Sequence, residues 1–186
     1  MRFDVLTLFP ELIKSHMDFS IMKRASDEGI ISVNTINPRD FTHDKHKKVD
    51  DTPYGGGAGM VLMPQPYIDA YNSLEKVENS ITLMMTPQGK PFTDKISNEL
   101  AKYEQVIILC GHYEGFDERI REIIKPREIS IGDFVLTGGE LPALCIIDSI
   151  SRKIEGTLGK IESAHDDSFA DGLLEYPQYT KPREYM

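Results

Sequence analysis

The sequence predicts an α/β protein with a parallel β-sheet flanked by helices. Apolar strand candidates alternate with helix candidates along most of the chain, the pattern typical of such sheets. Three glycine-bearing segments follow strand candidates: residues 86–89, 111–115 and 131–143. Ligands bind beyond the carboxyl ends of the strands in these sheets, so the three segments together predict a ligand pocket.

The first half of the alternation starts with an apolar run at residues 3–8, which predicts a buried strand. Pro10 can open a helix and Gly29 can stop one, so a helix is expected at residues 10–28. Residues 30–36 alternate between apolar and polar side chains, as a half-buried strand does.

The second half repeats the pattern. A helix is expected at residues 66–77, a short buried strand at 81–85 and an amphipathic helix at 93–103. Residues 105–110 form the most apolar strand candidate. The remaining elements expected are a helix at 116–124, a strand at 128–131 and a helix at 141–153.

Composition narrows the class of protein. The 186 residues fit one domain, or one domain with a short appendage. The net charge of −9 argues against a broadly basic surface for coating nucleic acid, but leaves room for a local basic patch. No apolar run approaches the roughly 20 residues that span a bilayer, and a strand is expected from residue 3, so a cytoplasmic protein without membrane segments or a signal peptide is expected. Cys110 and Cys145 lie in apolar contexts and predict two buried, reduced thiols.

Residues 37–59 form a long polar and glycine-rich loop, and loops of this length are usually functional or disordered. Its first part carries Arg39, His46 and several lysines. The simplest interpretation is a solvated charged loop. The alternatives are a contact surface for a phosphate backbone and a histidine–aspartate metal site, whose spacing matches no strong signature.

The sequence PYGGGAGM at residues 53–60 is not a phosphate-binding P-loop. It lacks the Lys-Ser/Thr pair and does not have the spacing of a dinucleotide-binding motif. It is either a flexible turn or a wall of glycines against which a flat group can lie.

Three polar residues have a plain and a functional interpretation. Glu114 is either a surface acid or a group that holds an amine, a sulfonium-bearing ligand or hydrated Mg²⁺. Arg152 near a helix end can simply complement the helix dipole. Asp167 can simply cap a short helix. The residues alone do not assign any of them a catalytic role.

Taken together, the motifs resemble one family. The chain is similar to the catalytic domain of the bacterial tRNA (guanine-N1-)-methyltransferases, the TrmD family of knotted SPOUT methyltransferases, and the resemblance spans essentially all 186 residues. The matching segments, in chain order, are LFPE, PRDFTHDKHKKVDDTPYGGGAGM, TPQG, GHYEGFDER, IGDFVLTGGELPA, IDSISR and DSFADGLLEYPQYTKP.

The resemblance implies a parallel α/β sheet with a deep trefoil knot, which periodicity would never suggest. It also implies a homodimer with the site at the subunit interface, and the residues expected on the dimer face are Leu141, Leu144, Cys145 and Ile147. The implied cofactor is S-adenosylmethionine, held mostly by backbone atoms. Matched position by position, its pocket comprises Pro87, Gly111, Tyr113, Glu114, Ile131, Gly132, Leu136, Gly138 and Gly139.

The implied reaction is methylation of N1 of guanine 37 in tRNA. Asp167 would be the general base that removes the N1 proton, and Arg152 would stabilise the negative charge on O6. Glu114 is a candidate contact for Mg²⁺, on which the family depends. The residues expected to contact the tRNA are Gly55, Gly56, Gly57, Gly59, Arg39 and His46.

The same resemblance implies a catalytic domain at residues 1–160 and a catalytic loop and interdomain linker at residues 161–186. The family continues into a helical tRNA-binding domain, so weakened tRNA binding is expected of this chain. The alternative functions are a cofactor-binding but catalytically weak domain of a larger or fused RNA-modifying protein, a cofactor-sensing protein, and a non-catalytic RNA-binding module.

Overall fold

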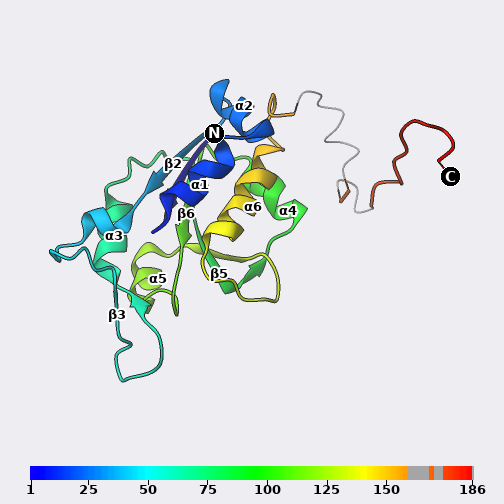
Figure 1. The fold of residues 1–186 in the computed structure, drawn as a ribbon. Coiled ribbons are helices and arrows are strands. Elements are labelled where there is room, and N and C mark those ends of the chain that lie inside the picture. Colours follow the sequence, from blue (N-terminus) through cyan, green and yellow to red (C-terminus); the bar gives the residue numbers. More distant parts are fainter. Residues whose placement is uncertain (159–167, 170–173, 186) are drawn as a thin grey trace.

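A five-stranded parallel sheet forms the centre of the molecule, as predicted (Figure 1). The computed structural model describes residues 1–158, 168–169 and 174–185. The strands lie in the order β2-β1-β6-β5-β7, and every neighbouring pair is parallel. Their bounds are β1 Arg2–Leu6, β2 Ser32–Ile36, β5 Ser80–Pro91, β6 Gln105–Cys110 and β7 Arg127–Ser130.

Helices cover both faces of this sheet. One face packs against α1 (Pro10–Met17), α2 (Ser20–Asp27), α4 (Asp94–Leu100) and α6 (Glu140–Ser151). The other packs against α3 (Pro64–Asn72) and α5 (Glu118–Ile124). Strand β6 serves both layers, because side chains along a strand alternate between faces and all six of its residues are buried. The apolar run at residues 105–110 therefore identified the central strand correctly.

Two elements differ from the sequence prediction in the first half of the chain. The helix expected at residues 10–28 is divided into α1 and α2 at Asp18–Phe19, and Ser20 has a φ of 52°. The loop expected at residues 37–59 contains the 3-10 helix η1 (Pro38–Phe41) and the strand β3 (Asp50–Asp51). Strand β3 pairs antiparallel with β4 (Val61–Leu62), a long-range contact that the local sequence does not signal.

Strand β5 is longer than the predicted strand at residues 81–85. It continues to Pro91, and its register against β7 shifts between Met85 and Lys90. The segment TPQG is therefore a bulge inside a strand and not a loop beyond its end, since the extra residues leave the ladder and return to it.

The prediction that both cysteines are buried is wrong for Cys145. Cys110 is buried in β6, whereas Cys145 is exposed on α6. Successive residues of a helix point about 100° apart, so an apolar run on a helix cannot bury every member. For the same reason only two of the four residues expected on the dimer face, Leu141 and Cys145, are exposed. Leu144 and Ile147 belong to the core of this chain, while Leu141 is 53% exposed.

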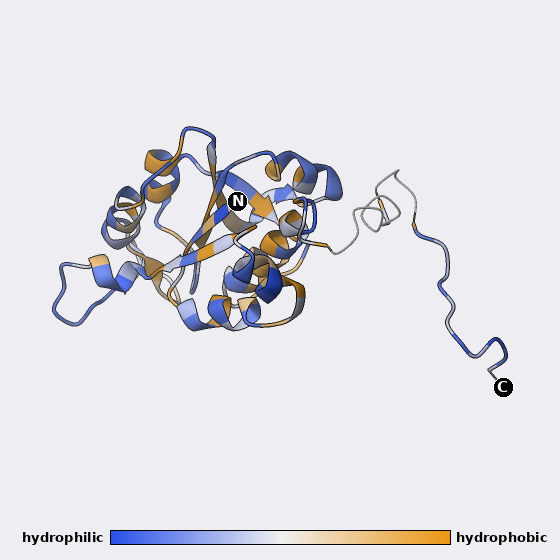
Figure 2. Ribbon diagram, turned by 90° about the horizontal axis from the view of Figure 1, so that it is seen from above, coloured by the Kyte–Doolittle hydropathy of each residue, from blue (hydrophilic) through white to orange (hydrophobic). Residues whose placement is uncertain are grey.

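The segment 174–185 leads away from the body of the molecule and is hydrophilic over much of its length (Figure 2). Its side chains are exposed. Among the described residues, no helix is long and apolar enough to cross a membrane. The trefoil knot and the division at residue 160 stay predictions.

Candidate functional site

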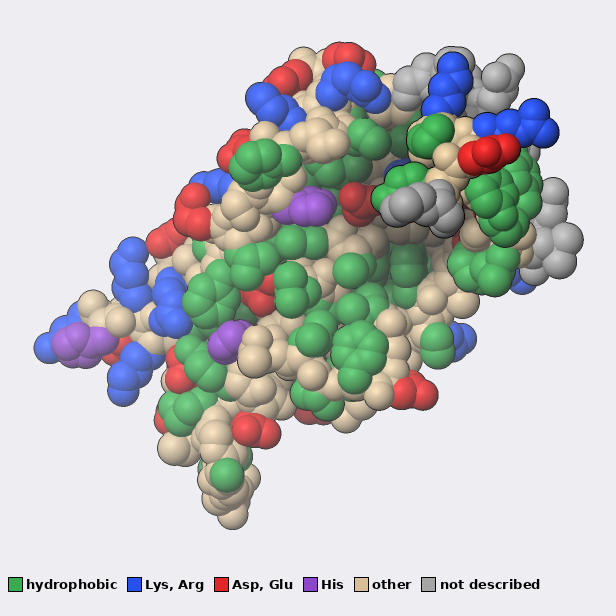
Figure 3. All heavy atoms as spheres, turned by 45° about the vertical axis from the view of Figure 1, so that its right-hand side comes forward, with side chains coloured by type: hydrophobic (Ala, Val, Ile, Leu, Met, Phe, Trp, Pro, Cys, Tyr) green, Lys and Arg blue, Asp and Glu red, His purple; other side chains and the backbone are tan. Residues whose placement is uncertain are grey.

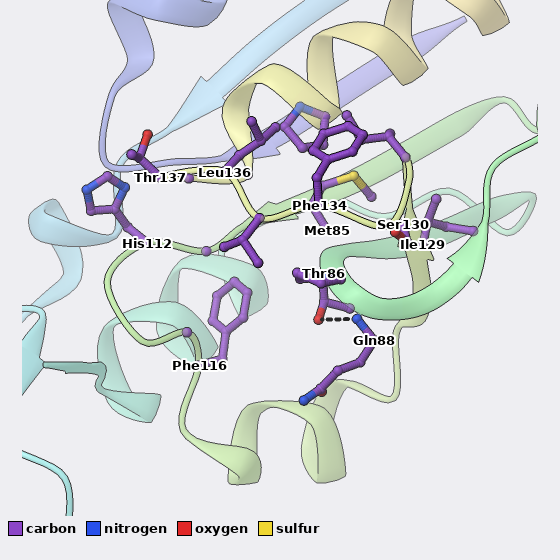
Figure 4. A pocket seen from close by; sticks show the side chains of 18 of the residues that line it. Met85, Thr86, Gln88, His112, Phe116, Ile129, Ser130, Phe134, Leu136 and Thr137 are labelled. Atoms are coloured by element: carbon purple, nitrogen blue, oxygen red, sulfur yellow. Dashed lines mark hydrogen bonds between the residues drawn. The ribbon is translucent and has the colours of Figure 1, made fainter. Parts of the chain in front are cut away.

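The site lies at the carboxyl ends of β6 and β7 and at the bulge of β5, the strand between them. There the bulge of β5 and the loops that follow β6 and β7 enclose a cavity of about 350 Å³ (Figure 4). Cavities of this size hold small-molecule ligands and cofactors. The three glycine-bearing segments were predicted to form one pocket. The structure brings them together because β6, β5 and β7 are neighbours in the sheet, with β5 in the middle.

All nine residues expected to contact a cofactor line this cavity. They come from three stretches separated along the chain and share a position on loops or on the bulge. They are Pro87, Gly111, Tyr113, Glu114, Ile131, Gly132, Leu136, Gly138 and Gly139.

Two of the three segments are joined directly through their backbones. The Gly139 N–H donates to the Gly111 carbonyl over 2.8 Å, and His112 pairs with Gly138 in an isolated antiparallel bridge. A Cβ at position 139 would lie 2.8 Å from the Cys110 Cα and 2.9 Å from the Gly111 nitrogen. Only glycine permits this approach, because the atoms in the way belong to the backbone.

The bulge in β5 is held by side chains from the neighbouring elements. The Gln88 N–H donates to the Thr86 hydroxyl over 3.3 Å (Figure 4). Arg121 donates to the Gln88 side-chain oxygen and to Glu128, each over 3.2 Å. These contacts fix the first wall of the cavity to α5 and β7.

Large apolar side chains form part of the cavity wall. Phe134 is 52% exposed and Val135 is 81% exposed, and both line the cavity. The apolar character of this run suggests a strand, but the structure gives residues 131–139 no strand. Both side chains were missed as site residues, and the glycines on either side, Gly132 and Gly138, were the signal for a loop.

Buried polar groups lie directly beneath the loops. The Thr7 hydroxyl donates to the Glu140 carboxylate over 2.7 Å, and the Tyr67 hydroxyl donates to the Cys110 carbonyl over 3.0 Å. Burial, and then the nearby Glu140 carboxylate, raise the pKa of the Cys110 thiol. The thiol therefore stays protonated near neutral pH and does not act as a nucleophile, since the thiolate is the reactive form.

The expected glycine wall meets the pocket at one point. A Cβ at Gly59 would lie 2.3 Å from a carboxylate oxygen of Glu114, so the two segments are in close contact. A Cβ at Gly55 or Gly56 would meet nothing within 4 Å, and one at Gly57 would meet Pro53 only. All four glycines have positive φ, and the backbone is open at Gly55 and Gly56.

Arg39 is half-buried and His46 is exposed. Lys, Arg and His side chains gather on a projecting edge of the molecule (Figure 3). Arg39 donates to the Lys47 carbonyl over 3.2 Å. Backbone N–H groups of Lys48 and His46 donate to Asp44, and these hydrogen bonds lower the pKa of that carboxyl. Asp44 therefore shapes the loop and leaves several cations facing solvent. Neither Arg39 nor His46 lines the cavity.

The described residues do not bring the two expected catalytic residues into this cavity. Arg152 follows the last turn of α6 and lines a separate cleft of about 200 Å³ with His16, Phe19 and Asp148. Asp167 lies outside the described residues. Within the described part of the chain, no group of three or more His, Cys, Asp or Glu side chains is arranged to hold a metal ion.

Comparison with known proteins decides the family. A sequence model described as tRNA (guanine-1)-methyltransferase TrmD matches residues 1–186. The chain belongs to the TrmD family.

Relatives of the TrmD family are similar over the whole chain. The tRNA (guanine-N(1)-)-methyltransferases of Staphylococcus epidermidis and Clostridioides difficile are each 55% identical to it, and the matches cover all of this chain and 76% and 81% of those proteins. The crystal structure of the tRNA (m1G37) methyltransferase from Aquifex aeolicus has a TM-score of 0.82 and 42% identity, and the match covers all of this chain and 78% of that one.

Proposed function

We propose that this chain transfers the methyl group of S-adenosylmethionine to N1 of guanine 37 in tRNA. One observation carries the proposal. The three segments that the family resemblance assigns to cofactor binding line a single cavity at the carboxyl edge of a parallel sheet. Membership of the TrmD family gives the reaction class.

The pocket fits S-adenosylmethionine by its size and its backbone-rich walls. Gly111, Gly138 and Gly139 have no side chains, so a ligand can approach the backbone of these loops closely. Apolar surface from Leu136 and Phe134 is available to a flat ring. The bound cofactor would supply an electrophilic methyl group on its sulfonium sulfur.

Guanine N1 carries a proton at neutral pH, so a base must remove it before the nitrogen can attack. We assign this role to Asp167, whose carboxylate can accept the proton. Loss of the proton places negative charge on O6, and we assign the stabilisation of that charge to the Arg152 guanidinium. The loops contribute by holding the reacting groups in line.

Arg152 lines a different cleft from the cofactor pocket, and this supports a homodimer as the functional unit. A second copy would bring the groups for base chemistry to the cofactor pocket of the first. Leu141, exposed on α6, and Val135, exposed on the loop after β7, provide apolar surface for that contact.

The tRNA would approach from the side of the projecting loop. Gly59 contacts Glu114 at the pocket, and Gly55, Gly56 and Gly57 continue from it as an open wall on which a base extruded from its stack can lie. Arg39 and His46 would contact phosphates, which position a nucleic acid without reading its sequence. A cytoplasmic location would follow from this substrate.

The described residues do not fit a protein-built Mg²⁺ site. Glu114 is the only carboxylate among the residues that line the cavity, and Mg²⁺ requires near-octahedral oxygen ligands. The proposed steps are therefore assigned to Asp167 and Arg152, and none is assigned to the metal.

Labelled S-adenosylmethionine and tRNA transcripts test the proposal. Transcripts with guanine at position 37 should accept the label, and matched transcripts with adenine there should not. Label in both, or in neither, would contradict it. The alternative, a cofactor-binding but catalytically weak domain, predicts cofactor binding by calorimetry without transfer to any transcript.

A further inference from the structure

A buried hydrogen bond links Thr7, near the amino terminus, to Glu140, which directly follows the pocket-lining Gly139. The Thr7 hydroxyl donates to the Glu140 carboxylate over 2.7 Å across 133 positions. Thr7 is 0% exposed and Glu140 is 4% exposed. Neither residue lines the pocket itself. A charge-assisted hydrogen bond without competing water is among the stronger polar contacts in proteins.

Thr7 lies at the end of a central strand, and Glu140 lies next to the pocket. Thr7 directly follows β1, and its backbone N–H donates to Ile36 at the end of β2. Its hydroxyl also accepts a hydrogen bond from the Phe9 N–H over 2.9 Å. Glu140 is the first residue of α6 and directly follows Gly138 and Gly139, which line the cofactor pocket.

The carboxylate also sets the space around Gly138. A Cβ at position 138 would lie 2.4 Å from the second carboxylate oxygen of Glu140 and 2.8 Å from His112 Nδ1. That histidine nitrogen is buried without a hydrogen-bond partner among the described residues. The His112 ring lies 5.0 Å from the Phe9 ring, which follows Thr7 by two positions. Glu140, His112 and the end of β1 therefore close around Gly138.

We infer that Thr7 and Glu140 form a positioning pair that holds the loop 131–139 against the loop 111–116 in its cofactor-binding shape. The pair touches neither cofactor nor substrate, and its link to S-adenosylmethionine rests on the proposed function. Without the hydroxyl, a buried carboxylate loses its donor, and the start of α6 and the preceding glycines lose their attachment to the sheet. The hydrogen bond from Gly139 to Gly111 then opens more often, and the two loops spend less time in the shape that binds the cofactor.

Thr7→Val tests the pair, because valine keeps the shape of threonine and removes the hydroxyl. Gln105→Leu is the matched control. Gln105 donates to the buried Asp4 carboxylate over 2.6 Å, and it lies at the amino-terminal end of β6, away from the pocket. Both changes deprive a buried carboxylate of one donor, so both should reduce stability.

Two readouts separate the variants. Amide hydrogen exchange at Gly139 should become faster in Thr7→Val and stay unchanged in Gln105→Leu, once global unfolding has been subtracted. The Kd for S-adenosylmethionine should rise by about 10- to 100-fold in Thr7→Val, the range found when outer-shell hydrogen-bond partners are removed at metal sites. It should be unchanged in Gln105→Leu and in Thr7→Ser, which restores the hydroxyl.

Glu140→Gln provides a milder variant if Thr7→Val does not fold. Its amide oxygen still accepts from Thr7 but carries no charge, so its effects should lie between those of wild type and Thr7→Val. Unchanged exchange at Gly139 in both variants, or an equal loss of affinity in Gln105→Leu, would overturn the inference. Absence of cofactor binding by the wild type would instead contradict the proposed function, and the exchange measurements would still decide the role of the pair.

Discussion

Gly139 donates its backbone N–H to the Gly111 carbonyl over 2.8 Å, and this bond joins the loops that follow β7 and β6. The approach is so close that a Cβ at Gly139 would lie 2.8 Å from the Cys110 Cα. Close backbone contact therefore holds these two loops together at the wall of the pocket.

Gly139→Ala should abolish binding of S-adenosylmethionine, because the new methyl group forces the two loops apart. Calorimetry measures the loss. The control is Gly29→Ala, at a glycine with a φ of +71° where a Cβ would meet nothing within 4 Å. That change should lower stability by about 1 kcal/mol through backbone strain and leave cofactor affinity intact. Normal binding by Gly139→Ala would show that the loops separate without harm.

Asp167→Asn should lower the rate of methyl transfer by a factor on the order of 10²–10⁴, the range for a lost general base. Asparagine keeps the size of the side chain and cannot take the proton. Single-turnover kinetics with labelled cofactor measures the effect, and cofactor affinity should change little. If Asp166→Asn loses methyl transfer while Asp167→Asn transfers at a rate near that of wild type, the general base is Asp166.

The chain should have the mass of a dimer by light scattering at micromolar concentration. Leu141→Glu places a charge on the exposed face of α6 and should shift the protein toward the monomer, with loss of methyl transfer. The matched control is Ile123→Glu, since Ile123 is 59% exposed on α5. Full activity of a monomeric wild type would contradict the site shared between subunits.

Residues 1–186 should bind tRNA weakly, with a shallow dependence on salt. The net charge is −9, and the main basic cluster holds Arg39, Lys45, Lys47 and Lys48. Each phosphate contact contributes at most about 0.9 to the log–log salt slope, so a slope no steeper than about −4 is expected. Lys45→Ala should reduce it by up to about 1, and Lys102→Ala, an exposed lysine on another segment, should not. A much steeper slope would reveal a second tRNA-binding surface.

Asp117 should stabilise the protein in a pH-dependent way. Side-chain hydrogen bonds from Arg119 lower the pKa of its carboxyl, and the carboxylate also accepts from the first turn of α5. A lowered pKa means that the contribution is complete above the ordinary carboxyl pKa and disappears as the pH falls through the folded-state pKa.

Asp117→Ala should therefore cost about 1 kcal/mol near pH 7, the usual value of a helix N-cap. The difference from wild type should shrink on acidification, as urea unfolding at several pH values would show. Asp117→Asn keeps a capping oxygen and should lose less. A difference that grows toward acid would contradict the sign of the pKa shift.

The local sequence was sufficient for the alternation of strands and helices and for the position of the pocket. Apolar runs such as residues 105–110 have a strand period, and parallel strands place their following loops at one edge of the sheet. The family resemblance named nine cofactor residues, and all nine line the cavity. Local patterns could indicate the alternation and the pocket because periodicity and glycine placement act within a few residues, whereas the nine residues came from the resemblance alone.

Only the tertiary structure decided which distant residues meet. The Thr7–Glu140 bond crosses 133 positions, the bulge in β5 depends on its pairing with β7, and the rotation of α6 exposes Cys145 while it buries Ile147. Arg152 follows the last turn of that helix and lines a separate cleft. Such relationships arise from strand order and from packing across the sheet, where each contact depends on elements far apart in the chain, and no local period encodes them.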